Sequence, residues 1–236
     1  MSYRFFGELI NGEVRLQDDD IFHLTKVLRI KPHEEIEVVA SGKLYRTKVA
    51  SFTPFNLTVF SEEQLNNELD YTLTLIYVQP KRDKFELALE KAVELGVTKI
   101  IVTTSAYSVV KIKESRSENK LIRYNKIIKS AAMQAKRDAI PELIFIPGFT
   151  DALQAGSGVK IIASEHEQEA TFSSHLKTPS DVTIVIGSEG GFKTEEVTLA
   201  ADLGYSPVTF GPLILRTETS VIYALSIINN FLRGAK

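Results

Sequence analysis

Cysteine is absent from this chain of 236 residues. Disulfides, thiolate metal sites and cysteine nucleophiles are therefore excluded. Histidine is scarce, and the four histidines are scattered without the spacing of metal ligands, at His23, His33, His166 and His175. We therefore expect no metal site.

Long apolar runs are also missing. No stretch approaches the roughly 18 residues that a membrane-spanning helix requires, and the opening MSYRFFGELI lacks the basic flank, apolar core and cleavage site of a secretion signal. The sequence thus predicts a soluble, cytoplasmic protein without a membrane partner.

Neither GxxxxGK[ST] nor GxGxxG occurs, which argues against a P-loop NTPase and a nicotinamide-dependent oxidoreductase.

Acidic and basic residues nearly balance, at a net charge of −2, which alone argues against a dedicated nucleic-acid binder. Their distribution indicates otherwise, because residues 111–137 carry two Glu and nine cations: Lys111, Lys113, Arg116, Lys120, Arg123, Lys126, Lys129, Lys136 and Arg137. Such a patch can neutralise phosphates even on a mildly acidic protein. The alternative interpretation is a solvated helix face.

The first seventy residues predict a small β-rich domain. Asn11-Gly12 and Ser41-Gly42 each separate two short strand-like segments, which is the signal of a β-hairpin. One short helix is expected at about 19–28. Several short strands in so few residues favour a small barrel.

A polar stretch at 62–70 marks the expected boundary between domains of residues 1–70 and 71–236. Beyond it, apolar strands alternate with helices, which is the pattern of a parallel α/β domain. Strands are predicted at 73–79, 99–104, 142–146, 159–164, 182–187 and 207–210. Helices are predicted at 84–96, 118–138, 194–203 with Thr194 as the cap, and from Thr217 or Thr219 to Arg233.

Three of these strands open into loops, at 163–167, 187–191 and 211–219. Ligands of open α/β sheets bind outside the carboxyl ends of the strands. Glycines allow the backbone of such a loop to approach a ligand closely, although tight structural turns use them as well. Arg216 stands just before a helix start, where a cation gains nothing from the helix dipole, and this position favours a role in a site.

The same loops carry a resemblance to a known family. GSEGGF (187–192) followed by FGPLILRTETS (210–220) resembles the GPEGGF and LGPRILRTETA blocks of the RsmE family, which belongs to the SPOUT superfamily of methyltransferases. Further segments resemble family blocks in the same order: HLTKVLRI (23–30), KRDKFELALEKAVELGV (81–97) and RYNKIIKSAAMQAKR (123–137). The similarity covers essentially the whole chain.

The resemblance implies an α/β SPOUT methyltransferase domain with a deep C-terminal trefoil knot, preceded by a small PUA-like β-barrel that binds RNA. It implies S-adenosyl-L-methionine (SAM) as methyl donor, S-adenosyl-L-homocysteine as product, no metal, and a homodimer. The implied reaction is methylation of N3 of a specific uridine in small-subunit 16S ribosomal RNA, with the assembled subunit as substrate.

The chemistry of methylation at uridine N3, together with the resemblance, suggests roles for individual residues. Arg216 would stabilise the deprotonated uracil, and Glu218 or Glu189 would act as the base or orient Arg216. The cofactor would be bound by Ser164, Glu165, Gly187, Glu189, Gly190, Gly191, Gly211, Leu213, Leu215, Arg216 and Thr219. RNA would be contacted by Arg29, Lys81, Arg82, Arg123, Gln134 and Arg137.

Several positions depart from the family blocks; among them, Ser188 replaces Pro, Leu213 replaces Arg, and Ser130 replaces an acidic residue. The change at Leu213 removes one possible RNA or phosphate contact. Two alternatives stay open from sequence, a SPOUT enzyme that methylates another rRNA or tRNA nucleotide, and a SAM-binding ribosome assembly factor without catalysis.

Overall fold

The computed structural model describes residues 2–108, 117–176 and 180–234. The chain forms two compact units, the first of Met1–Glu68 with Ala132–Ala139 and the second of Leu69–Ala131 with Ile140–Lys236. The short segment 132–139 therefore packs with the first 68 residues, which the linear division at residue 70 did not anticipate.

The first unit contains a four-stranded sheet and a separate hairpin. The sheet has the order β1 (Tyr3–Phe6), β4 (Glu35–Ala40), β5 (Lys43–Phe52) and β6 (Phe55–Gln64), and the hairpin pairs β2 (Glu8–Ile10) with β3 (Glu13–Arg15). Asn11 and Gly12 have φ of 52° and 82°, and Ser41 and Gly42 have φ of 48° and 73°. Positive φ at both central residues is the type I′ geometry that closes two-residue hairpins, so both hairpin predictions are confirmed.

The predicted helix at 19–28 divides into two parts. It is α-helical in α1 (Asp18–Phe22) and π-helical in η1 (His23–Val27). Leu24 is fully buried in the core of this unit, whereas Phe22 and Val27 are exposed.

A buried ion network attaches segment 132–139 to the sheet. The Arg4 side chain is 5% exposed, and its Nε lies 2.9 Å from Glu37 Oε2 while its Nη1 lies 2.6 Å from Asp138 Oδ1. Arg137 forms a second pair, with Nη2 2.6 Å from Glu68 Oε2. Because buried charges are tolerated only when they are paired, these contacts fix the segment in place.

The network predicts how the stability of this unit depends on pH. Burial alone would raise the pKa of Glu37, but hydrogen bonds from Ser2, Lys136 and Arg4 lower it to about 2. A carboxylate whose pKa is lower in the folded state than in the unfolded state stabilises the fold. This contribution is fully present above the unfolded-state pKa of 4.5 and is lost as the pH falls through the folded-state pKa of about 2.

We therefore expect the free energy of unfolding to fall between about pH 4.5 and pH 2 more steeply in the wild type than in Glu37→Gln, in urea denaturation at a series of pH values. Glu13→Gln is the matched control, because the Glu13 side chain is 63% exposed. Equal slopes for the wild type and Glu37→Gln would contradict the assignment.

The second unit is built on a six-stranded sheet in which every neighbouring pair is parallel. The strand order is β12 (Ser206–Val208), β10 (Val159–Ala163), β11 (Val182–Ile186), β7 (Leu73–Val78), β8 (Lys99–Thr103) and β9 (Glu142–Phe145). All residues of β7 and β11 are buried. Burial on both faces explains why these strands are continuously apolar.

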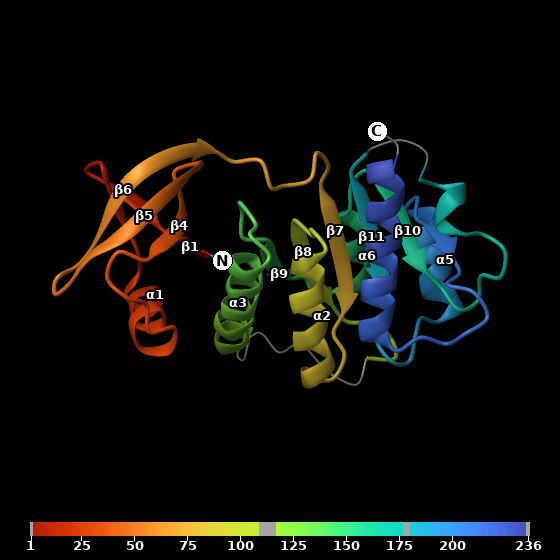
Figure 1. Cartoon of the computed structure of the whole chain (residues 1–236). Coiled ribbons are helices and arrows are strands. Elements are labelled where there is room, and N and C mark those ends of the chain that lie inside the picture. Colours follow the sequence, from red (N-terminus) through yellow and green to blue (C-terminus); the bar gives the residue numbers. More distant parts are fainter. Residues whose placement is uncertain (1, 109–116, 177–179, 235–236) are drawn as a thin grey trace. The chain divides into compact units, whose positions relative to one another are not determined.

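Helices cover both faces of this sheet (Figure 1). They are α2 (Arg82–Glu94), α3 (Ser117–Gln134), α4 (Phe149–Gln154), α5 (Thr194–Asp202) and α6 (Thr217–Gly234). Ile76 packs with Leu153 of α4 and Ala200 of α5, whereas its neighbour Tyr77 stacks on Phe85 of α2 with ring centroids 5.7 Å apart. Successive strand residues point to opposite faces, so α4 and α5 lie on one face and α2 on the other, beside α6.

Two helix predictions are wrong at their ends. The helix expected at 118–138 ends at Gln134, because Lys136 adopts a φ of 58° and the following residues join the first unit. Lys193, not Thr194, is the N-cap of α5, and its backbone N–H donates to Glu196 Oε2 at 2.9 Å. Within the described residues, no helix combines the length and apolar composition needed to cross a bilayer.

Candidate functional site

The strand order reverses between β11 and β7, because β8 and β9 continue on one side of β7 while β10 and β12 lie beyond β11. Such a reversal opens a crevice at the carboxyl ends of the strands, where ligands of α/β sheets bind. A cavity of about 1000 Å³ lies there. It is lined by residues 163–168, 186–189, 191–192 and 209–217, with Lys84 and Ser220.

The loops after β10, β11 and β12 therefore share one cavity. Of the residues predicted to bind the cofactor, the lining includes Ser164, Glu165, Gly187, Glu189, Gly191, Gly211, Leu213, Leu215 and Arg216. Gly190 and Thr219 are not part of it. At Gly190 a Cβ would meet Tyr107 Cβ at 2.8 Å, so this glycine packs against the segment after β8, and Thr219 is exposed on α6.

Hydrogen bonds hold two of the loops together. Thr217 Oγ1 donates to the Gly187 carbonyl oxygen at 2.6 Å and lies 3.0 Å from the Tyr77 hydroxyl. Burial raises the pKa of Tyr77, with smaller effects from Glu218 and Glu189 in the same direction. The hydroxyl therefore stays protonated, and it connects the end of β7 to the start of α6.

The loop after β10 lies close to the glycine loop. Gly191 has a φ of 64°, and a Cβ on it would lie 2.9 Å from Glu165 Oε1. A side chain at this position would be strained and would push the carboxylate away. The absence of a side chain thus lets the Glu165 carboxylate lie against the backbone of the neighbouring loop.

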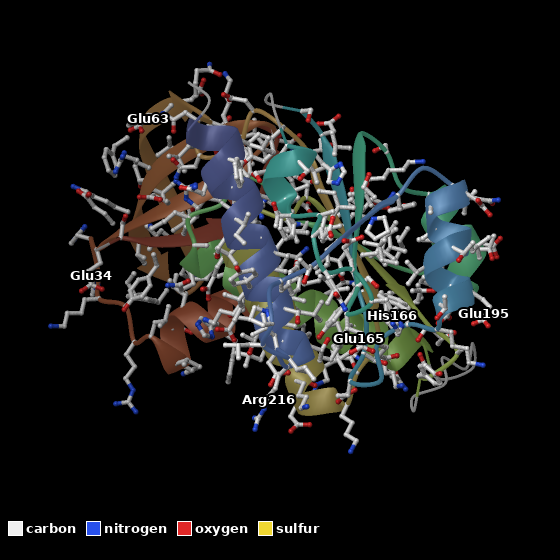
Figure 2. The ribbon with its side chains drawn as sticks, turned by 90° about the vertical axis from the view of Figure 1, so that its right-hand side faces the viewer. Glu34, Glu63, Glu165, His166, Glu195 and Arg216 are labelled. Atoms are coloured by element: carbon white, nitrogen blue, oxygen red, sulfur yellow. The ribbon has the colours of Figure 1, made fainter. Side chains whose placement is uncertain are left out.

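Charged groups of both signs line the cavity. Lys84 Nζ is 3.5 Å from Glu189 Oε1, while Arg216 is exposed. Figure 2 shows Arg216 at the start of α6, pointing away from the ribbon, on the same side of the unit as Glu165 and His166. Among the residues that the structure describes, Ser188 Oγ and Glu218 Oε2 are buried without a hydrogen-bond partner. Such unpaired buried atoms are costly and are often completed by a ligand.

The residues predicted to contact RNA fall into different environments. Arg29, Lys81 and Gln134 are exposed. Arg123 is 47% exposed, with Nη2 2.7 Å from Glu86 Oε2. Their exposed positions leave these side chains available to a large polyanion.

Arg137 differs, because its side chain is 5% exposed and is occupied by Glu68. This geometry leaves no free guanidinium for a phosphate. The side chain of Arg82 lies outside the described residues, as do Lys111, Lys113 and Arg116 of the basic stretch. The described part of that stretch is therefore only partly available for RNA contact.

The cavity is also lined by Lys84, Thr217 and His166, which are not among the predicted site residues. Lys84 lies in the first turn of α2, directly after the carboxyl end of β7. The same rule that selected the other loops would have selected this position too. The described residues contain no group of three or more side chains suited to a metal ion.

Comparison with known proteins extends this picture. A family model of the RNA methyltransferase domain matches residues 67–229, and a model of the RNA methyltransferase PUA domain matches residues 16–54. The ribosomal RNA small subunit methyltransferase E of Rickettsia conorii is 31% identical over 92% of this chain and 89% of its own length. The one from Bacillus subtilis is 29% identical over 98% of both chains. The crystal structure of ribosomal RNA small subunit methyltransferase E from Neisseria gonorrhoeae, bound to SAM, is 27% identical with a TM-score of 0.88 over 98% of each chain.

Proposed function

The chain belongs to the RNA methyltransferase family, and from this premise we propose that it methylates N3 of a specific uridine in 16S ribosomal RNA with SAM as donor. The single observation that carries the proposal is the convergence of three loops on one cavity at the strand-order reversal. Two of those loops contain the segments that resemble the RsmE family. The enzyme class is SAM-dependent rRNA methyltransferase.

The cavity residues fit SAM. The cavity volume of about 1000 Å³ is at the upper end of the range for small-molecule sites. Ile186, Leu213 and Leu215 supply apolar walls, while Gly211 adopts a φ of 94° that lets the backbone turn closely around a ligand. Buried Ser188 Oγ still needs a hydrogen-bond partner. We propose Ser164 and Glu165 for the ribose.

Bound SAM supplies an electrophilic methyl group on a sulfonium. Uridine N3 becomes a good nucleophile only after it loses its proton, and the resulting negative charge spreads onto the two carbonyl oxygens of the base. A guanidinium near those oxygens favours this ionisation, and we assign that role to Arg216 at the cavity mouth. Glu189 in the cavity wall and Glu218 in the first turn of α6 are the candidate proton acceptors.

For RNA binding we propose the exposed residues Arg29, Lys81, Arg123 and Gln134, with residues 1–70 as the RNA-binding domain and 71–236 as the methyltransferase domain. Exposure and charge support these assignments, since phosphate contacts position an RNA while base contacts specify it. We leave Arg137 out, because Glu68 occupies its guanidinium.

We also propose a homodimer and a deep trefoil knot. Leu213 and Ile214 are 74% and 92% exposed, and Phe210 of the same loop packs against Tyr223 with ring centroids 5.3 Å apart. An apolar surface of this kind is suited to burial against a second copy. The knot is proposed from the resemblance to the SPOUT superfamily. The proposed substrate is the assembled small subunit in the cytoplasm.

The test is transfer of a labelled methyl group from SAM to small ribosomal subunits that lack the modification, with naked 16S rRNA in parallel and mass spectrometry of the product nucleoside. We expect N3-methyluridine, with more from the subunit than from naked rRNA. A different methylated nucleoside would contradict the assignment of uridine N3 as the methylated atom, but it would still support SAM-dependent RNA methylation. SAM binding without transfer to either RNA would favour the assembly factor, and no SAM binding would overturn the enzyme assignment.

A further inference from the structure

Lys84 and Glu189 form an ion pair inside the cavity wall that the proposed reaction does not use as a pair. Lys84 comes from the first turn of α2 and Glu189 from the loop after β11. Their side chains are 29% and 30% exposed, so both remain accessible to a ligand. Backbone hydrogen bonds also hold the two elements, from Phe85 N–H to the Lys81 carbonyl oxygen at 3.1 Å and from Gly191 N–H to the Ser188 carbonyl oxygen at 3.0 Å.

The contact between Lys84 and Glu189 is longer than a good hydrogen bond. The separation of 3.5 Å between Lys84 Nζ and Glu189 Oε1 exceeds the 2.7–3.2 Å range of good hydrogen bonds. An ammonium has three donors and a carboxylate about four acceptor sites, so contacts with the described residues use only part of the capacity of each group. Next to Glu189, the buried Ser188 Oγ also lacks a partner.

Two other titratable groups of the lining, Glu167 and His166, are already engaged within the protein. Glu167 Oε1 accepts the backbone N–H groups of residues 168, 169 and 170, and so stabilises its own turn. His166 Nε2 lies 3.2 Å from the Phe192 carbonyl oxygen. Arg216 belongs to the loop before α6 and is exposed. Among the described residues of the wall, the Lys84–Glu189 pair brings opposite charges together and leaves them open to a ligand.

Resting on the proposed function, we propose that Lys84 and Glu189 together bind the amino-acid end of SAM, with Lys84 on its carboxylate and Glu189 on its ammonium. This assignment leaves Glu218 as the candidate proton acceptor. A zwitterion can replace the internal pair with two charge-assisted hydrogen bonds and leaves no charge unpaired. The apolar and glycine-rich remainder of the lining then accommodates the adenosine. Lys84 is thus a specificity residue for the cofactor.

Calorimetric titration with two thioether nucleosides tests the proposal. S-adenosyl-L-homocysteine carries the amino-acid end, and 5′-methylthioadenosine lacks it. We expect Lys84→Met to weaken binding of S-adenosyl-L-homocysteine by about 10- to 100-fold, the range for a charged hydrogen bond. Binding of 5′-methylthioadenosine should change by less than about twofold, because that ligand never meets Lys84.

Lys91→Met is the matched control, because Lys91 lies on the same helix, pairs with Glu90 and Glu94, and is outside the cavity lining. Lys84→Arg keeps the charge, so it should retain most of the affinity for S-adenosyl-L-homocysteine. This variant takes the place of Lys84→Met in the test if the methionine variant does not fold. Equal losses for both ligands, or no loss for either, would overturn the role of Lys84. Wild-type protein that binds neither nucleoside would instead overturn the proposed function.

Discussion

Replacing Arg216 with alanine is expected to lower kcat for methyl transfer by about 10²- to 10³-fold. This is the usual effect of removing one preorganised hydrogen-bond donor that stabilises a developing anion. Arg216 lies at the mouth of the cavity and is exposed, so its guanidinium can meet the base that enters from outside. The affinity for SAM should change little. Single-turnover rates with saturating SAM and RNA would separate the chemical step from binding.

Two further variants sharpen the Arg216 experiment. Arg216→Lys keeps a positive charge but loses the planar pair of donors, so its rate should lie between those of wild type and Arg216→Ala. Lys99→Ala removes a cation that pairs with Glu142 on β8 and β9, away from the cavity lining, and should leave the rate unchanged. A wild-type rate in Arg216→Ala would remove Arg216 from the mechanism, and a parallel loss of SAM affinity would make it a cofactor ligand.

The second large effect concerns stability. Replacing Arg4 with methionine should lower the free energy of unfolding of the first unit by about 3–5 kcal/mol, because it leaves Glu37 and Asp138 buried without their shared cation. The Arg4 guanidinium also donates to the Lys136 carbonyl oxygen at 2.5 Å, which would lose that bond. Urea denaturation followed by circular dichroism would measure the loss.

The control for Arg4 is Arg15→Met. Arg15 pairs with Glu13 at 3.0 Å, but both side chains are more than half exposed. A surface pair of this kind contributes about 0–1 kcal/mol, so the variant should unfold nearly as the wild type does. Similar, small losses for Arg4→Met and Arg15→Met would show that the buried network does not hold segment 132–139 in place.

The sequence was informative where local chemistry decides the structure. Asn11-Gly12 and Ser41-Gly42 predicted both hairpins, because few other residue pairs adopt two successive positive φ values. The strands of the second unit were visible as apolar runs, since a parallel sheet is covered on both faces. The rule that places ligands at strand ends pointed to the loops that line the cavity.

The sequence was uninformative where distant segments meet. Arg137 belongs to a basic stretch and was predicted to contact RNA, but its partner Glu68 lies 69 positions earlier. The strand-end rule points to the region of Lys84, but only the fold shows that Lys84 pairs with Glu189. Pairings between distant segments leave no periodic pattern in the sequence, so composition and spacing could not predict them.

The discontinuity of the first unit has a consequence for protein synthesis. Arg4 leaves the ribosome 134 residues before Asp138, its partner in the ion network. At a translation speed of about 5–20 residues per second, the delay is roughly 7 to 27 seconds. During that time the early strands lack the segment that completes their core and neutralises their buried charges. The first unit can therefore complete its fold only after segment 132–139 has been synthesised.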